Sequence, residues 1–421
     1  MPSGKLFRSG ALRSAIAFAV GGGGFALANV LLARQMAPRE FGLVVLFVAL
    51  TQLGATLGPA GMDTVAVRHR LGPSAHLFMK VLTSATALGG IAAIALLVFF
   101  DFSTQLCCLL IVAVVLSALN RMGCSFMQSL EQYRRGLGLM LAHNAVLLGA
   151  TLILIAVDRV EVEAVAVLLT IGYGITTVFG WMVGRRLLSS HMLRDSVRSY
   201  AREGFTIVAS QTSTAILNQL DRLLIPRLLS PGALGEYAAA AVLCASPFNL
   251  LQSGTRYTLL PKLRNSTSRA HALKLLRNEA LAIFSMMVIA GSACFLLAPA
   301  VSQWLFHGRY QLGPELVELL VILGVLKVWH SFTAGCVQAL GSQRALMTLS
   351  VAGWAALAIA IAGMFGAEEL ELEAIVSAIA FAWFVLCIAS TLIAMQGILA
   401  PQGARADSAA SKVWPTRGSF R

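Results

Sequence analysis

The stretches "RQMAPREFG" at 34–42 and "RLLSPGALG" at 227–235 share one pattern, R-x-x-x-P-x-x-x-G. Each stretch follows an apolar run with the length of a helix, and Arg, Pro and Gly all recur at a separation of 193 residues. Proline ends a helix because it lacks a backbone N–H and clashes with the preceding turn, and glycine allows the backbone to reverse. The pattern therefore predicts one corner, at which a helix ends at the Arg, turns at the Pro and re-enters at the Gly, present twice in the chain.

The composition around these corners indicates a membrane protein. Of the 421 residues, 57% are hydrophobic and 12% are charged, and the mean hydropathy is +0.78, whereas soluble domains carry about 25% charged residues. Runs of about 20 apolar residues are long enough to span a bilayer as helices, and they are continuous rather than alternating, unlike β-barrel strands. We therefore predict an all-α integral membrane protein with twelve transmembrane helices, at 14–36, 42–66, 78–100, 105–127, 136–157, 163–184, 204–226, 233–258, 280–305, 314–338, 344–366 and 373–396.

The distribution of positive charge predicts the orientation. With a cytoplasmic N-terminus, 25 of the 32 Lys and Arg residues fall on the cytoplasmic side and five on the opposite side. Cytoplasmic loops carry the excess of Lys and Arg in membrane proteins, so both termini are expected in the cytoplasm. Anionic lipid head groups account for the net charge of +13, and no nucleic-acid partner is expected.

The duplication extends beyond the two corners. "QSLEQYR" at 128–134 matches "QALGSQR" at 338–344, and "DRVEVEAV" at 158–165 matches "EELELEAI" at 368–375, both at a separation of 210 residues. The second copy thus has 17 extra residues, which we expect in the loops 257–279 and 306–313. Six helices per copy is an even number, so the copies form a parallel repeat, and two such bundles give alternating access by rocking against each other.

The repeat divides the chain into four parts. They are an N-terminal six-helix bundle at 1–190, a basic cytoplasmic linker at 191–203, a C-terminal six-helix bundle at 204–398 and a disordered cytoplasmic tail at 399–421.

Motifs of enzymes and metal sites are absent from the sequence. The seven Cys residues fall inside the predicted spans without a C-x-x-C pair, which indicates neither a disulfide framework nor a zinc site. No P-loop, His cluster or nucleophile elbow occurs. We predict a protein that is not an enzyme and has no cofactor; whether H+ or Na+ is a coupling ion stays open.

A few ionisable residues lie inside the predicted spans, where their insertion costs about 2.5–3.5 kcal/mol each and function is the default hypothesis. Asp221 and Arg222 lie in the outer half of the seventh span, with Asn218 on the same side of the helix. We expect Arg222 to attract an anion and Asp221 to orient it or to take up a cation; the alternative is a structural ion pair with a neighbouring helix. The first copy has Asn29 at the position of Arg222.

The tenth span carries a second candidate. Lys327 lies near mid-span with His330 three residues on. Arg and Lys bind phosphate as a fork and as a point charge, respectively. Lys327 is too deep to reach either surface easily, so it is expected to face a hydrated cavity; packing without function is the alternative.

Four residues are candidates for gating. Asp63 and Arg256 occupy equivalent positions of the two copies and have opposite charges, so they are expected to latch the cytoplasmic side; separate solvated charges are the alternative. Pro59 and Pro247 interrupt the second and eighth spans, where they are expected to let helices bend.

The stretch "LNQLDRLLIPRLLSPGALGEYAAA" at 217–240, together with "QSLEQYR" at 128–134 and twelve spans, resembles the polysaccharide-transport (Wzx-like, O-antigen flippase) family of the multidrug/oligosaccharidyl-lipid/polysaccharide exporter superfamily. The resemblance covers nearly the whole chain, but Pro226 stands where the family usually has a small residue. It implies two MATE-like six-helix bundles around a cationic cavity, with Arg222 near an anionic head group.

The resemblance also implies a substrate and a place. The substrate is an oligosaccharide joined by diphosphate to a polyprenol, which is moved from the inner to the outer leaflet of the bacterial cytoplasmic membrane during O-antigen or exopolysaccharide biosynthesis. We expect a monomer in the bilayer; contacts with other glycan-assembly membrane proteins stay open. The alternatives are a cation-coupled multidrug exporter of the same fold, although the first span contains no acidic residue, and a membrane scaffold without transport.

Overall fold

The computed structural model describes residues 10–69, 71–100, 102–130, 132–187, 197–252, 255, 263, 269–310, 312–366 and 371–399. This part of the chain is helical and contains no strand. Its helices are α2 (Gly10–Gln35), α3 (Pro38–Leu57), α4 (Met62–His69), α5 (Ala75–Phe100), α6 (Thr104–Ser129), α7 (Tyr133–Ala156), α8 (Val162–Leu187), α9 (Val197–Leu228), α10 (Pro231–Cys244), α12 (Arg269–Phe306), α13 (Pro314–Leu340), α14 (Gln343–Phe365) and α15 (Leu372–Leu399).

The helices confirm the all-α membrane architecture. Among the described residues, eight helices are long and apolar enough to cross a membrane, or nine if the bent pair Pro231–Cys244 and Ser246–Gln252 forms one span. Each of the twelve predicted spans coincides with a helix or a broken pair, but the count of twelve crossings stays a prediction. The predicted spans at α2, α7 and α9 are not among these eight or nine helices, and α9 carries Gln219, Asp221 and Arg222 within its length.

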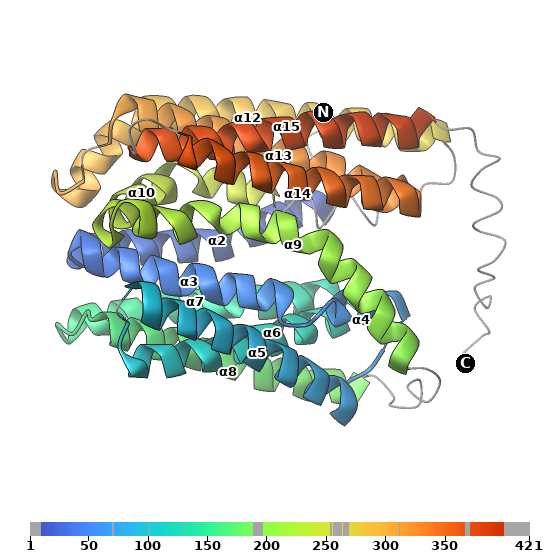
Figure 1. Ribbon diagram of the computed structural model, residues 1–421, viewed down its shortest axis with the longest axis horizontal. Helices are drawn as coiled ribbons and strands as arrows, with labels where there is room; N and C mark the ends of the chain where they lie inside the picture. Colours follow the sequence, from blue (N-terminus) through green and yellow to red (C-terminus); the bar gives the residue numbers. More distant parts are fainter. Residues whose placement is uncertain are drawn as a thin grey trace, which may run out of the picture.

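Figure 1 shows the arrangement of the helices in two groups. Helices α12 to α15 lie together on one side, α5 to α8 lie on the other, and α2, α9 and α10 run between them. α6 packs against α5, α7 and α8, and α13 packs against α15. The predicted division at 190–204 stays a prediction, since 188–196 and the tail from 400 onward lie outside the described residues.

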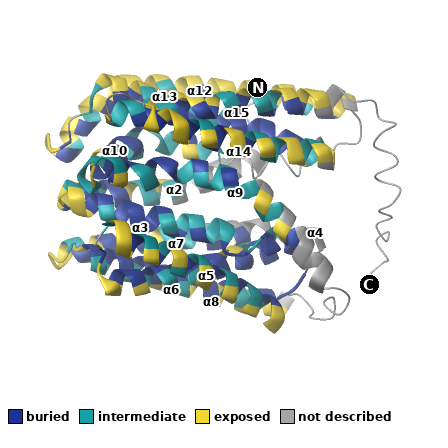
Figure 2. Ribbon diagram, in the orientation of Figure 1, coloured by how far each residue is buried: buried dark blue, intermediate teal, exposed yellow. Residues whose placement is uncertain are grey.

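The burial of side chains fits a lipid environment. The helices α12 and α14 expose large apolar residues along their length (Figure 2), including Leu296, Trp304 and Val351. By contrast, α3 and α6, which pack against each other while α3 also packs against α10, are mostly buried. Exposed apolar surface on this scale needs lipid rather than water around it.

Equivalent contacts in the two halves confirm the internal repeat. The Thr177 hydroxyl donates to the Leu116 carbonyl at 2.8 Å, and the Cys387 thiol donates to the Leu326 carbonyl at 3.1 Å. Both members of the second pair lie 210 residues after those of the first. The pairs α6–α8 and α13–α15 therefore pack in the same register.

The two corners have a different local structure from the one the sequence predicts. Pro38 and Pro231 are the first residues of α3 and α10, where a missing N–H costs nothing because that position has no intrahelical partner. The Ser230 hydroxyl accepts from the Ala233 N–H at 3.1 Å and caps α10. Gly42 and Gly235 lie within helices rather than at the turns, so the prediction that they reverse the backbone is wrong.

The two glycines instead allow the two halves to meet. A Cβ at Gly42 would lie 1.9 Å from the Pro231 carbonyl oxygen, and a Cβ at Gly235 would lie 2.0 Å from the Pro38 carbonyl oxygen. Each corner thus presses its glycine against the proline of the other corner, which is the contact expected across a pseudo-two-fold axis. The repeated motif forms a reciprocal contact between the halves, on the side that the charge distribution predicts to be outside.

The extra residues of the second copy mainly lengthen a helix. α12 has 38 residues against 26 in its counterpart α5, so the prediction that they lie only in loops is wrong. The corner after α12 then reaches the end of α2: Arg309 Nη1 donates to the Arg34 and Met36 carbonyls at 2.9 Å each, and the Tyr310 hydroxyl donates to the Ala33 carbonyl at 3.1 Å. Burial raises the pKa of Tyr310 to about 12.

Removing the Arg309 side chain is expected to loosen the end of α2. Arg309→Ala leaves two terminal carbonyls without their charged donor, which we expect to cost about 1–2 kcal/mol. Thermal unfolding in detergent micelles measures this as a lower midpoint. Arg159→Ala, which removes an exposed arginine from the α7–α8 connection, is the control; equal midpoints for the two variants would contradict the capping role.

Candidate substrate-binding site

Asp221 lies in a buried polar cluster where α9, α10 and α13 meet. Its side chain is 3% exposed. Oδ1 accepts from the backbone N–H of Arg222 at 2.8 Å, and Oδ2 accepts from the hydroxyl of Tyr237 at 2.5 Å. A hydroxyl that donates to a carboxylate makes a short, charge-assisted bond, so the buried carboxylate is well satisfied by α9 and α10 alone.

Lys327 approaches the same carboxylate from α13. Its Nζ lies 3.8 Å from Asp221 Oδ2 and 5.7 Å from the centroid of the Trp383 ring. An ammonium hydrogen-bonded to a carboxylate lies about 2.7–2.9 Å from it, so this ion pair is loose. Asp221 thus pairs with a neighbouring helix, as in the alternative to substrate binding that the sequence left open. However, the three donors of the Lys327 ammonium make no hydrogen bond within the described residues.

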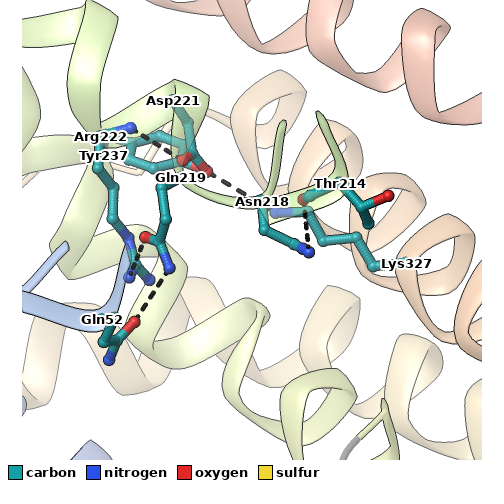
Figure 3. Close-up of polar contacts among 8 residues, drawn as sticks. All are labelled: Gln52, Thr214, Asn218, Gln219, Asp221, Arg222, Tyr237 and Lys327. Carbon is teal, nitrogen blue, oxygen red and sulfur yellow. Dashed lines mark hydrogen bonds and ion pairs between the residues drawn. The ribbon is translucent and has the colours of Figure 1, made fainter. Parts of the chain in front are cut away.

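Arg222 points away from Lys327, toward the N-terminal half (Figure 3). Its Nη1 donates to Gln219 Oε1 at 3.2 Å, and Gln219 Nε2 donates to Gln52 Oε1 of α3 at 3.1 Å. α9 continues through Pro226, which lacks the N–H that would otherwise bond the carbonyl of Arg222 four residues before it. The two cations therefore lie on different sides of α9, one inside the C-terminal half and one at the contact between the halves.

The other predicted binding residues bond within their own half. Asn218 Nδ2 donates to the Thr214 carbonyl at 3.0 Å, and Asn29 Nδ2 donates to the Phe25 carbonyl at 2.8 Å, each one turn back along its own helix. His330 is 3% exposed, and its Nδ1 lies 3.3 Å from the Ser390 hydroxyl of α15. Substrate binding by these three residues stays a prediction.

Of the predicted gating residues, Pro59 and Pro247 lie at breaks between helices, and Asp63 lies in the first turn of α4. Asp63 of α4 pairs with Arg121 of α6 at 3.0 Å, and Arg256 lies outside the described residues, so the latch between Asp63 and Arg256 stays a prediction. Pro59 lies in the break between α3 and α4, where Ala60 and Gly61 have positive φ values of 51° and 74°. Pro247 lies just after α10, where the axis bends by 61°.

Three residues of the site were missed by the sequence reasoning, namely Tyr237, Gln219 and Gln52. Tyr237 lies within the quoted stretch 217–240, two residues after Gly235, so its closeness to the repeated corner was a usable signal. Gln52 and Gln219 carry no charge, and their contact joins the two halves. The sequence alone could not predict this contact, because it depends on how the halves pack.

The helical architecture and its internal repeat match the fold of solved membrane transporters. A structure described as the inward-facing conformation of a multidrug resistance MATE family transporter of the MOP superfamily matches with a TM-score of 0.60 and 16% identity, covering 95% of this chain and 99% of that one. An outward-facing MATE family transporter matches with a TM-score of 0.60 and 14% identity over 96% of both chains. A MOP superfamily transporter from Pyrococcus furiosus, described as having a binding pocket of reverse polarity, matches with 0.61 and 15% over 96% of both.

The family follows from the sequence. Residues 31–311 match the family model described as polysaccharide biosynthesis protein, and this range covers more than half of the chain, so the protein belongs to that family. No curated protein matches.

Proposed function

We propose that the protein moves a polyprenyl-diphosphate-linked oligosaccharide from the inner to the outer leaflet of the bacterial cytoplasmic membrane by alternating access. Family membership supports a role in polysaccharide biosynthesis, and the MATE-type fold supports transport. The role that we assign to the protein is transport, not catalysis.

The observation that carries this proposal is the loosely held ammonium of Lys327. A buried charge normally uses its donors, because an unsatisfied one is costly. Lys327 lies 3.8 Å from its only described ionic partner, so it has free donors for an oxygen-rich anion. A diphosphate crossing the bilayer needs such a partner for the same reason.

The charges of the site favour an anion over a cationic drug. Asp221, Arg222 and Lys327 carry two positive charges and one negative charge. In the described part of the N-terminal half, the acidic residues lie at helix ends or in connections: Glu40, Asp63, Asp158, Glu161 and Glu163. The similarity to multidrug transporters keeps a cation-coupled drug exporter as the second candidate, but a site for cationic drugs would need an uncompensated carboxylate.

Deletion of the gene tests the proposal. The expected result is loss of surface glycan together with accumulation of polyprenyl-diphosphate-linked repeat units, measured by gel analysis of the glycan and mass spectrometry of the lipid extract. Re-expression of the wild-type chain should reverse both effects. Unchanged glycan together with increased sensitivity to cationic dyes would contradict the flippase and favour the drug exporter.

A further inference from the structure

We infer that Asp221 pairs with Lys327 in the substrate-free transporter and that the substrate's phosphate later replaces Asp221 in this pair. We further infer that Tyr237 allows Lys327 to exchange the one partner for the other. The inference rests on the proposed function, because it assigns the anion that displaces Asp221 to the substrate's diphosphate. It makes Tyr237 a positioning residue, which acts on the substrate through Asp221 and Lys327.

The geometry suits an exchange. Lys327 Nζ lies 3.8 Å from Asp221 Oδ2, a distance at which the charges attract without a hydrogen bond. Figure 3 shows Lys327 reaching Asp221 from the side opposite to Arg222. A phosphate oxygen that offers the ammonium a direct, charge-assisted hydrogen bond is therefore the better partner.

Asp221 keeps its own partners when Lys327 leaves. The Tyr237 hydroxyl at 2.5 Å and the backbone N–H of Arg222 at 2.8 Å both stay in place, since neither belongs to α13. The usual penalty for separating a buried ion pair is the carboxylate left without compensation. Tyr237 lowers that penalty, so Lys327 can move to the substrate and return after release.

The internal repeat shows that the fold does not require this cluster. The positions equivalent to Asp221, Tyr237 and Lys327 in the first copy hold Ala28, Val44 and Ser117. Those three residues are buried in equivalent helices, at 0%, 3% and 1% exposure. Equivalent helices therefore pack in the first half without Asp221, Tyr237 and Lys327. All three residues occur together in the second half, as expected for residues that act together.

The test is a double-mutant cycle of Tyr237→Phe and Asp221→Asn in the full chain, reconstituted in lipid nanodiscs. The probe is undecaprenyl diphosphate, with inorganic pyrophosphate as a second ligand, and native mass spectrometry or titration calorimetry measures the dissociation constant. Phe keeps the buried ring, so folding should be preserved; equal thermal midpoints check this.

Tyr237→Phe should weaken binding about tenfold, because Asp221 without its hydroxyl partner holds Lys327 more tightly. Asp221→Asn should bind at least as tightly as the wild type. In the Asp221→Asn background, Tyr237→Phe should have no effect, because no charge remains to compete; a purely structural tyrosine would weaken binding in both backgrounds.

The results that would overturn the inference fall into two groups, and the two groups can be told apart. Wild-type binding that is unchanged by Tyr237→Phe, or weakened equally in both backgrounds, removes the exchange and leaves the proposed function standing. A wild-type chain that binds neither probe contradicts the proposed function, and the exchange falls with it.

Discussion

Alanine at Gly42 or Gly235 is expected to push apart the two halves at their ends on the predicted outer side. The new Cβ would lie 1.9 Å or 2.0 Å from a proline carbonyl oxygen of the opposite corner, and backbone cannot move aside as a side-chain end can. Overpacking of this kind costs about 1–3 kcal/mol, which shifts the balance between the closed and the separated contact about 5- to 150-fold. The state closed at this side should be depleted, and transport should fall with it.

Hydrogen–deuterium exchange and complementation measure the two effects. Backbone exchange should become faster in the segments 36–42 and 229–235, and surface glycan should not be restored in the deletion strain at equal protein level. The double variant should be little worse than either single one, because both changes break the same contact. Gly232→Ala is the matched control in α10, since its Cβ meets nothing closer than the Ser230 hydroxyl at 3.6 Å. Normal exchange and full activity in both glycine variants would show that the contact does not gate transport.

These corners show how far the sequence alone could predict the fold. The 193-residue repeat located both corners and predicted equivalent helices, because hydropathy and proline punctuation are local properties. The role assigned to Gly42 and Gly235 was wrong because a glycine that turns a chain and a glycine that admits another chain segment look alike in a sequence. The structure distinguishes these two roles, because it places each glycine against the proline of the other corner.

The site shows the same limit. Asp221, Arg222 and Lys327 could be singled out because an ionisable residue inside an apolar span is unusual by itself. Their pairing could not, because it depends on how α9 and α13 are rotated against each other. Adjacent residues on a helix point about 100° apart, which is why Asp221 meets Lys327 while Arg222 meets Gln219 and the N-terminal half.

Lys327→Met is expected to weaken binding of the diphosphate head group more than Arg222→Met does. Methionine nearly keeps the length of the side chain but removes the ammonium, whose hydrogen bonds to a charged group contribute about 1.5–3 kcal/mol, or about 10- to 150-fold in affinity. Arg222 already donates to Gln219, so less of its capacity is free and its loss should matter less. Binding of undecaprenyl diphosphate to purified protein and restoration of surface glycan in the deletion strain measure the difference.

Two further variants separate binding from folding. Lys274→Met removes an exposed lysine of α12 and should leave binding and glycan unchanged. The double variant Asp221→Asn with Lys327→Met removes both charges of the ion pair, so no carboxylate is left without a partner and stability should hold. A well-folded double variant that fails to bind shows that the ammonium itself holds the anion. If that variant binds the diphosphate as the wild type does, the anion is held elsewhere, and Arg222 at the contact between the halves becomes the residue to test.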